Sequence, residues 1–346
     1  MIPLHFRHFP LDYLLGAWYN KVEIPQTRHP QHSERAESMS NTEKDWRADW
    51  VENLKRLGCL IAIICFTAFV AGLFAPLHSR AKDAHAEKLW QKGRAAYKAK
   101  DYETAVKYYK KSAEQGNEKA QFNFALCYAK GEGVEKDLRE AAKWYRKAAE
   151  QGFALAQNML ALCYDTGEGV EQDYALAANW YRNAAEQGNA SAQLNLGACY
   201  ADGHGVGQDY AEAVKWYRKA ADQGLAEAQF ILGGCYESGE GVEQDYAQAA
   251  NWYRKAADQN LAEAQLHLGS CYLYGAGVKK DEKQAVKLFQ MSANQSNAMA
   301  QLVLGNCYYN GWGVKKNNAE AVKWYRKAAE QGNELAIEAL KRLGAE

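Results

Sequence analysis

A 36-residue repeat occupies most of the chain between residues 117 and 332. One cysteine column sets the period, since six cysteines follow one another at intervals of 36 residues: Cys127, Cys163, Cys199, Cys235, Cys271 and Cys307. A fixed period in this range is typical of stacked supersecondary units, each of which contacts mainly its neighbours in sequence. The repeat therefore predicts a solenoid rather than a closed globular core, and it favours an interaction role over an enzymatic one.

Each repeat predicts two helices joined by a glycine-containing loop. In residues 117–152, Phe124 and Tyr128 belong to one apolar stripe of a first helix. Gly131 and Gly133 end that helix, because glycine adopts backbone angles that other residues avoid. The chain is therefore expected to reverse once in every repeat and to begin a second helix after the loop.

The second helix of each repeat has capping signals at both ends. Asp137 is expected to be the N-cap, and Glu140, three residues later, to complete a capping box. Small alanines in this helix permit close approach, while its Trp and Tyr rings fill the space between repeats. Gly152 is expected to end the helix in the left-handed conformation, and Asn260 and Ser296 take its place in two later repeats.

The repeated residues resemble the Sel-1-like repeat, a relative of the tetratricopeptide repeat. The shared elements are Ala-x-x-x-Leu-Gly-x-x-Tyr, Gly-x-Gly-Val, an Asp cap, Ala-x-x-Trp-Tyr-x-Lys-Ala-Ala and Gln-Gly. The resemblance implies an α/α superhelix whose members act as adaptors for other proteins, with the first helices on the concave surface. We therefore expect an all-α solenoid with a tetratricopeptide-like N-terminal cap (84–116), six Sel-1-like repeats (117–332) and a C-terminal capping helix (333–346).

An uncharged run at residues 57–77 precedes the repeats. It is long enough to cross about 30 Å of hydrocarbon as a helix, and we interpret it as an uncleaved signal-anchor. The alternatives are a buried core helix and a cleaved signal peptide, which the long preceding segment disfavours. Residues 1–56 are polar and are predicted to form a disordered tail, with Met39 as an alternative start of translation.

The orientation of this predicted single-pass membrane protein depends on the charges that flank the span. Lys and Arg flank both sides of residues 57–77 in nearly equal numbers, so the positive-inside rule is nearly tied and slightly favours a cytoplasmic C-terminal side. A single N-terminal span directly after Lys55 and Arg56 commonly leaves the following domain outside, and we expect an extracytoplasmic repeat domain. The unpaired cysteines weigh against this orientation, because free thiols are uncommon in an oxidising compartment.

Positions that vary between repeats are the candidates for partner contact, since the repeated residues already build the scaffold. Positions 119, 123, 126 and 130 and their equivalents share one face of the first helix, offset from the apolar stripe. The residues predicted to bind a peptide or protein partner are Lys119, Asn123, Leu155, Met159, Leu162, Asn195, Ile231, His267, Tyr274 and Asn306. Leu155, Met159 and Leu162 are predicted to form an apolar pocket with polar groups beyond it. In the alternative interpretation, the apolar members pack against neighbouring first helices.

The sequence gives little support for disulfide bonds, an enzymatic active site or a metal site. Equivalent cysteines of adjacent repeats should lie roughly 10 Å apart, beyond the ~7 Å limit for a disulfide, so we expect small buried core thiols. Ser79 and Lys82 fit a Ser-x-x-Lys pattern but lack the accompanying motifs of penicillin-recognising enzymes. Neither His204 nor His267 has a metal-ligand spacing to other residues.

The balance of charge excludes a further class of partner. The chain has 42 Lys and Arg and 42 Asp and Glu, so it has no basic footprint for nucleic acid. We therefore predict a non-catalytic, membrane-anchored adaptor, without a cofactor or metal, that binds its partner on the concave face. The alternatives are a soluble secreted or periplasmic protein released by signal cleavage, and a hydrolase acting on cell-wall material.

Overall fold

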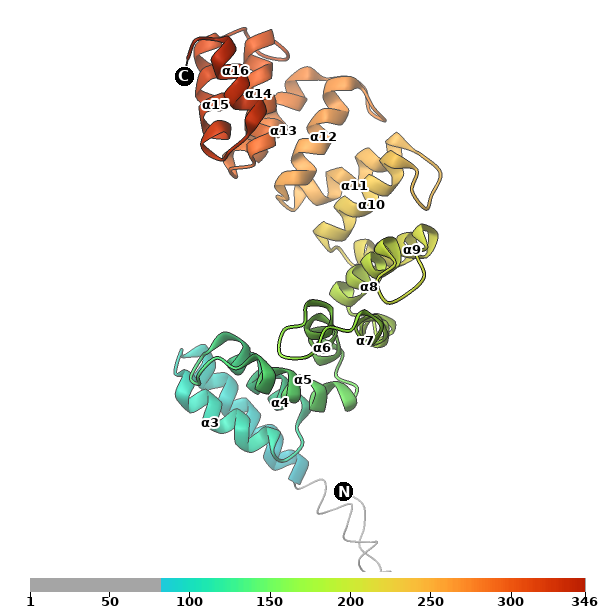
Figure 1. The fold of residues 1–346 in the computed structure, drawn as a ribbon, viewed down its shortest axis with the longest axis vertical. Coiled ribbons are helices and arrows are strands. Elements are labelled where there is room, and N and C mark those ends of the chain that lie inside the picture. Colours follow the sequence, from blue (N-terminus) through green and yellow to red (C-terminus); the bar gives the residue numbers. More distant parts are fainter. Residues whose placement is uncertain (1–81, 346) are drawn as a thin grey trace, which may run out of the picture. The chain divides into compact units, whose positions relative to one another are not determined.

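The computed structural model describes residues 82–345, and within this range every regular element is an α-helix (Figure 1). The prediction of an all-α repeat solenoid is confirmed for this part of the chain. The predicted tail (1–56) and the predicted membrane span (57–77) lie outside the described residues. None of the helices within 82–345 has both the length and the apolar character needed to cross a membrane.

The helices form consecutive antiparallel pairs. A helix over residues 82–98 and α3 (Tyr102–Ala113) form the first pair. The six following pairs are α4 (Glu118–Lys130) with α5 (Leu138–Glu150), α6 (Ala154–Thr166) with α7 (Tyr174–Glu186), α8 (Ala190–Asp202) with α9 (Tyr210–Asp222), α10 (Ala226–Ser238) with α11 (Tyr246–Asp258), α12 (Ala262–Tyr274) with α13 (Glu282–Asn294), and α14 (Ala298–Asn310) with α15 (Asn318–Glu330). The last helix is α16 (Glu334–Arg342).

From α3 to α16, the main contacts join each helix to the ones directly before and after it in sequence. Figure 1 shows the pairs following one another in chain order. Each repeat is therefore stabilised by its own helix pair and by its two neighbours, as expected for a quasi-one-dimensional array.

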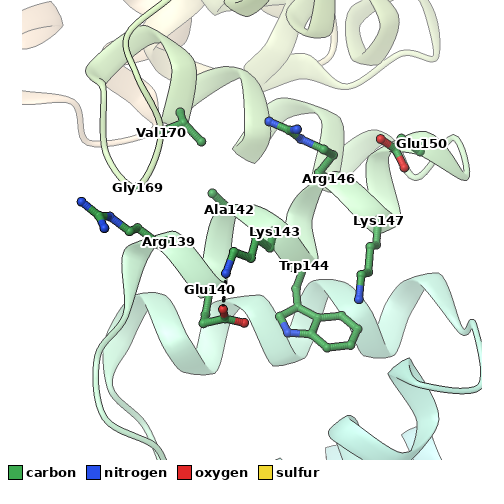
Figure 2. Close-up of a pocket in the computed structure, with 10 residues that line it drawn as sticks. All are labelled: Arg139, Glu140, Ala142, Lys143, Trp144, Arg146, Lys147, Glu150, Gly169 and Val170. Atoms are coloured by element: carbon green, nitrogen blue, oxygen red, sulfur yellow. Dashed lines mark hydrogen bonds and ion pairs between the residues drawn. The ribbon is translucent and has the colours of Figure 1, made fainter.

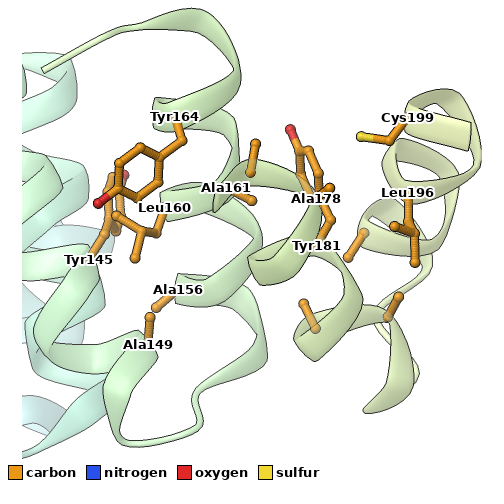
Figure 3. Close-up of a cluster of buried hydrophobic side chains, with 14 of the residues drawn as sticks. Tyr145, Ala149, Ala156, Leu160, Ala161, Tyr164, Ala178, Tyr181, Leu196 and Cys199 are labelled. Carbon is orange, nitrogen blue, oxygen red and sulfur yellow. The ribbon is translucent and has the colours of Figure 1, made fainter. Parts of the chain in front are cut away.

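The core between the helices consists of alternating small and large side chains. Around α5 to α8, Ala149 and Ala156 permit close approach, while Tyr145, Leu160 and Tyr181 fill the space that remains (Figure 3). All five side chains are almost completely buried. The repeated Ala and Tyr columns therefore build the solenoid, as the sequence predicted.

The six repeat cysteines are free thiols that contribute to this core. Four are buried and two, Cys163 and Cys235, are half-buried. Burial raises the pKa of Cys163 to about 11 and that of Cys127 to about 12, so the thiols stay protonated at neutral pH. The prediction of small buried core thiols is thus confirmed for four of the six, and the other two are less deeply buried than expected.

The capping prediction is correct in one half and wrong in the other. The Asp137 carboxylate accepts hydrogen bonds from the backbone N–H groups of Arg139 and Glu140, as an N-cap should. However, the Asp137 N–H does not bond to Glu140; it donates to the Tyr128 carbonyl of the preceding helix at 3.0 Å. The Glu140 carboxylate pairs with Lys143 instead. This backbone bond, which recurs at every equivalent cap, closes the loop and joins the two helices of a repeat.

The second glycine of each Gly-x-Gly-Val loop lies directly against the preceding repeat. A Cβ atom on Gly205 would lie 2.0 Å from the Tyr174 carbonyl oxygen at the start of α7, and Gly205 has a φ of +72°. The equivalent glycines face the equivalent backbone atoms at 2.0 to 2.3 Å. The loop is therefore a backbone-to-backbone contact between repeats, which explains why glycine recurs there.

A ladder of glutamines, which the sequence analysis did not predict, also joins the repeats. The Gln157 side chain is buried; its Nε2 donates to the Ala149 carbonyl at 3.2 Å, and its Oε1 accepts from Gln187 at 2.7 Å. The buried members are Gln121, Gln157, Gln193, Gln229, Gln265 and Gln301, and the donors from the end of the next second helix are Gln151, Gln187, Gln223, Gln259, Gln295 and Gln331. We call this set the glutamine ladder.

Replacement of Gly205 by alanine should be strongly destabilising, by about 2 kcal/mol or more, because it combines a left-handed φ with a clash between backbones. Gly207, two residues away, provides the control: its added Cβ would meet nothing within 4 Å. We expect Gly205→Ala to lower the midpoint of urea denaturation, followed by circular dichroism, and Gly207→Ala to leave it nearly unchanged. Equal effects of the two substitutions would contradict the proposed contact.

Candidate protein-interaction surface

The variable residues of the first helices form a surface that continues between repeats. We use the term first-helix face for the residues of α4, α6, α8, α10, α12 and α14 that are not buried against the second helices. On this face, Asn195 of α8 donates to Asn158 of α6 at 3.4 Å, and His267 of α12 lies 3.5 Å from the Glu237 carboxylate of α10. Neighbouring first helices therefore share contacts across the face.

At the N-terminal end, the predicted binding residues are partly engaged within the chain. The Lys119 ammonium lies 3.7 Å from the Glu87 carboxylate and 4.8 Å from the centre of the Trp90 ring. Asn123 lies beside the Tyr109 hydroxyl; burial raises the pKa of Tyr109, and the hydrogen bond with Asn123 opposes that rise. Lys119 and Asn123 therefore both contact residues of the first helix pair.

An apolar patch follows on α4 and α6. Leu155 is 48% exposed and Leu162 is 39% exposed, whereas Leu126 and Met159 are half-buried against the core. We use the term apolar patch for these four side chains. Packing within the chain thus accounts for Leu126 and Met159, but it leaves Leu155 and Leu162 in contact with solvent.

Tyrosine hydroxyls of the second helices also contact residues of the first-helix face. The Tyr253 hydroxyl donates to Glu237, and the Tyr325 hydroxyl donates to Asn306 at 2.8 Å. In contrast, Tyr145 is only 1% exposed, and its buried hydroxyl has no hydrogen-bond partner. A buried donor without a partner is costly, by about 1–3 kcal/mol, so this hydroxyl calls for an explanation. The ring N–H groups of Trp90, Trp216 and Trp252 are the other buried side-chain donors without a partner among the described residues.

The explanation lies in the residues around Tyr145. Equivalent tyrosines find partners at three positions, which Asn123, Glu237 and Asn306 occupy in other repeats. Around Tyr145, Met159, Ala129 and Leu126 occupy these three positions, and none of them has a side-chain acceptor comparable to an amide or carboxylate. The hydroxyl is therefore unpartnered because the patch above it is apolar.

The C-terminal part of the face is more polar. His267 packs against the rings of Phe230 and Tyr253, each with its centre 5.2 Å away, and Ile231 is half-buried. Tyr274 is 75% exposed, whereas Asn306 is engaged by the Tyr325 hydroxyl described above. The face therefore presents separate apolar and polar regions.

Two components of the surface escaped prediction from sequence. Tyr145 belongs to a repeated column and was assigned to the core alone. Glu237 lies just outside the four variable positions that were considered. Its own column also varies between repeats, with Ala129, Asp165 and Leu273 at equivalent positions, and this variation was a signal that could have identified it.

A pocket of about 500 Å³ lies on the other side of the repeats, between α5 and the loop at Gly169 (Figure 2). Three of its four cations are already engaged: Lys143 pairs with Glu140, Lys147 lies over the Trp144 ring at 3.7 Å, and Arg146 donates to Tyr164. We therefore do not assign a ligand to this pocket. Elsewhere within residues 82–345, no group of three or more His, Cys, Asp or Glu side chains could hold a metal ion.

Comparison with known proteins agrees with the geometry. The Sel1 repeat family matches seven consecutive segments: 90–117, 118–153, 154–189, 190–225, 226–261, 262–297 and 298–333. The first match lies in the segment that we predicted as a tetratricopeptide-like cap. A search of curated proteins gave no match.

Two solved structures extend the comparison. A protective antigen of uropathogenic Escherichia coli strains that displays an SLR fold is 39% identical, with a TM-score of 0.71, and covers 78% of this chain and 59% of its own. A Sel1 repeat protein from Oxalobacter formigenes is 38% identical, with a TM-score of 0.64, and covers 69% of this chain and 96% of its own. The chain thus spans about 59% of the length of the antigen.

The stacked helix pairs and their variable face define an α/α repeat protein of the kind that generally serves as a non-catalytic scaffold for protein interactions. More specifically, the chain belongs to the Sel1 repeat family.

Tyr145→Phe should not destabilise the free protein, because it removes only an unpartnered buried hydroxyl. Tyr325→Phe is the matched comparison, since it breaks the hydrogen bond to Asn306 and should cost about 0.5–1.5 kcal/mol. Urea denaturation of both variants measures the difference. A Tyr145→Phe variant less stable than Tyr325→Phe would show that the Tyr145 hydroxyl has a partner in solution.

Proposed function

We propose that the chain is a membrane-anchored adaptor that holds a peptide or protein partner on the first-helix face. The observation that carries this proposal is the apolar patch above the unpartnered Tyr145 hydroxyl. Exposed apolar side chains and a buried donor without an acceptor both gain from a partner that covers the patch and supplies an acceptor. In superhelices of this family the first helices line the concave surface, so the partner is placed there.

The anchor in this proposal is the uncharged run at residues 57–77, preceded by Lys55 and Arg56. The repeat domain is then extracytoplasmic, and the partner is a protein or peptide of that compartment. If the run is a cleaved signal peptide instead, the adaptor is released as a soluble secreted or periplasmic protein, and N-terminal sequencing of the mature product distinguishes the two forms.

The orientation can be tested with a reporter cysteine at the C-terminus. We expect Glu346→Cys to react with a membrane-impermeant maleimide on intact cells, because it follows the repeat domain. The unmodified chain is the control, since its repeat cysteines are buried or half-buried. Labelling of Glu346→Cys only after lysis would place the repeat domain in the cytoplasm.

The binding surface can be tested with two double variants of the full chain. We expect Met159→Asp with Asn195→Ala to lose the proteins that the unchanged chain retains in a pull-down, because the first places a charge in the apolar patch and the second removes a polar group of the face. Leu176→Asp with Asn179→Ala makes the same changes on the exposed side of α7 and should retain them. Equal retention by both variants would remove the first-helix face as the binding surface.

A further inference from the structure

The charges of the repeats are segregated between the two kinds of helix. The first helices α6, α8, α10, α12 and α14 contain no Lys or Arg at all. They contain five acidic residues: Asp165, Asp202, Glu227, Glu237 and Glu263. In contrast, the second helices α5, α7, α9, α11, α13 and α15 contain fifteen Lys and Arg against nine Asp and Glu. A nearly neutral chain therefore has an acidic side and a basic side.

The five carboxylates are available on the first-helix face. Asp202, Glu227 and Glu263 are exposed, and Asp165 and Glu237 are half-exposed. Within the described part of the chain, none of them forms a salt bridge with Lys or Arg, and only Glu237 has an ion-pair partner, which is His267. The first helix α4, which also belongs to this face, carries Lys119 and Lys130, so the uncompensated negative charge is that of α6 to α12.

The apolar patch adjoins this acidic region and adds an independent requirement. The Tyr145 hydroxyl below the patch is more than nine-tenths buried and lacks an acceptor. Because Tyr109, Tyr253 and Tyr325 bond to groups of the first-helix face, this donor points to an acceptor from outside the chain, such as a backbone carbonyl. Such an acceptor reaches the hydroxyl when the side chains that cover it move aside. An extended peptide supplies carbonyl groups along its whole length, whereas a small cation supplies none.

We propose that the partner is a basic peptide segment, held by apolar side chains on the patch and by Lys or Arg residues over the carboxylates of α6 to α12. This inference rests on the proposed function and names the chemistry of its partner. With repeats roughly 10 Å apart, α6 to α12 span about 30 Å, which about nine extended residues cover. The exposed charges speed association and favour basic over acidic partners, and added salt weakens their effect.

The probes are three pools of fluorescein-labelled 12-residue peptides, randomised over Leu, Ser, Gly and one further residue. That residue is Lys in the basic pool, Glu in the acidic pool and Gln in the neutral pool. Binding to the full chain in phosphatidylcholine nanodiscs is measured by anisotropy in low salt, with empty nanodiscs as the blank. We expect the basic pool to bind at least about tenfold more tightly than the neutral pool, and the acidic pool not to bind.

Matched variants locate the effect on the molecule. Neutralising the exposed carboxylates of the first-helix face (Asp202→Asn, Glu227→Gln and Glu263→Gln) should abolish most of the preference for the basic pool. The same three changes on exposed carboxylates of second helices (Asp222→Asn, Glu150→Gln and Glu186→Gln) should preserve it.

A third variant tests the Tyr145 hydroxyl. Tyr145→Phe should weaken binding of the basic pool several-fold without changing its advantage over the neutral pool. Unchanged affinity for Tyr145→Phe would overturn the part of the proposal that assigns an acceptor to this hydroxyl.

The outcomes also separate this inference from the proposed function. Equal or tighter binding of the neutral or acidic pool, or no binding of any pool, overturns the basic partner. The adaptor function would nevertheless stand if the Met159→Asp and Asn195→Ala double variant still lost its proteins in the pull-down. Sedimentation tests one further alternative. If the chain forms a dimer that the Asp202→Asn, Glu227→Gln and Glu263→Gln variant dissociates, the basic second-helix side of another copy occupies the face. That result would also overturn the inference.

Discussion

The glutamine ladder is the interaction on which the register of the solenoid depends. Helices built largely from alanine could slide past one another at little cost, because small apolar surfaces have few distinguishing features. A buried amide with both a donor and an acceptor partner permits only one alignment, since a shift would leave both groups unpaired. Gln157 is fixed in this way by Ala149 of the preceding repeat and by Gln187 at the end of the second helix of its own repeat.

The sequence was sufficient for the helices and their order, because these follow from local signals that recur every 36 residues. It was less informative about contacts between repeats. The Asp137 N–H bonds to Tyr128 rather than to Glu140, and a capping pattern read along one helix cannot reveal an acceptor on another. The role of Gln157 was hidden for the same reason, since a repeated polar residue next to a helix start looks like a surface position.

The candidate surface was predicted in outline but not in its chemistry. Variable columns identified Leu155 and Leu162, which remain exposed, and His267, which contacts Glu237. They could not identify Tyr145, because a repeated tyrosine column does not show which hydroxyl is buried without a hydrogen-bond partner. One structural difference between repeats therefore lies in a repeated residue, because the hydrogen bonding of that residue differs from repeat to repeat.

The contact of Gly205 with the Tyr174 carbonyl has a consequence for how such a chain can change length. Each loop fits the helix start of the repeat before it, so every junction along the array has the same shape. Deletion or duplication of one whole repeat preserves this contact at the new junction. Insertion or deletion of a few residues instead displaces the loop glycine from the helix start against which it packs. In evolution, this architecture can therefore lengthen or shorten its first-helix face in whole-repeat steps.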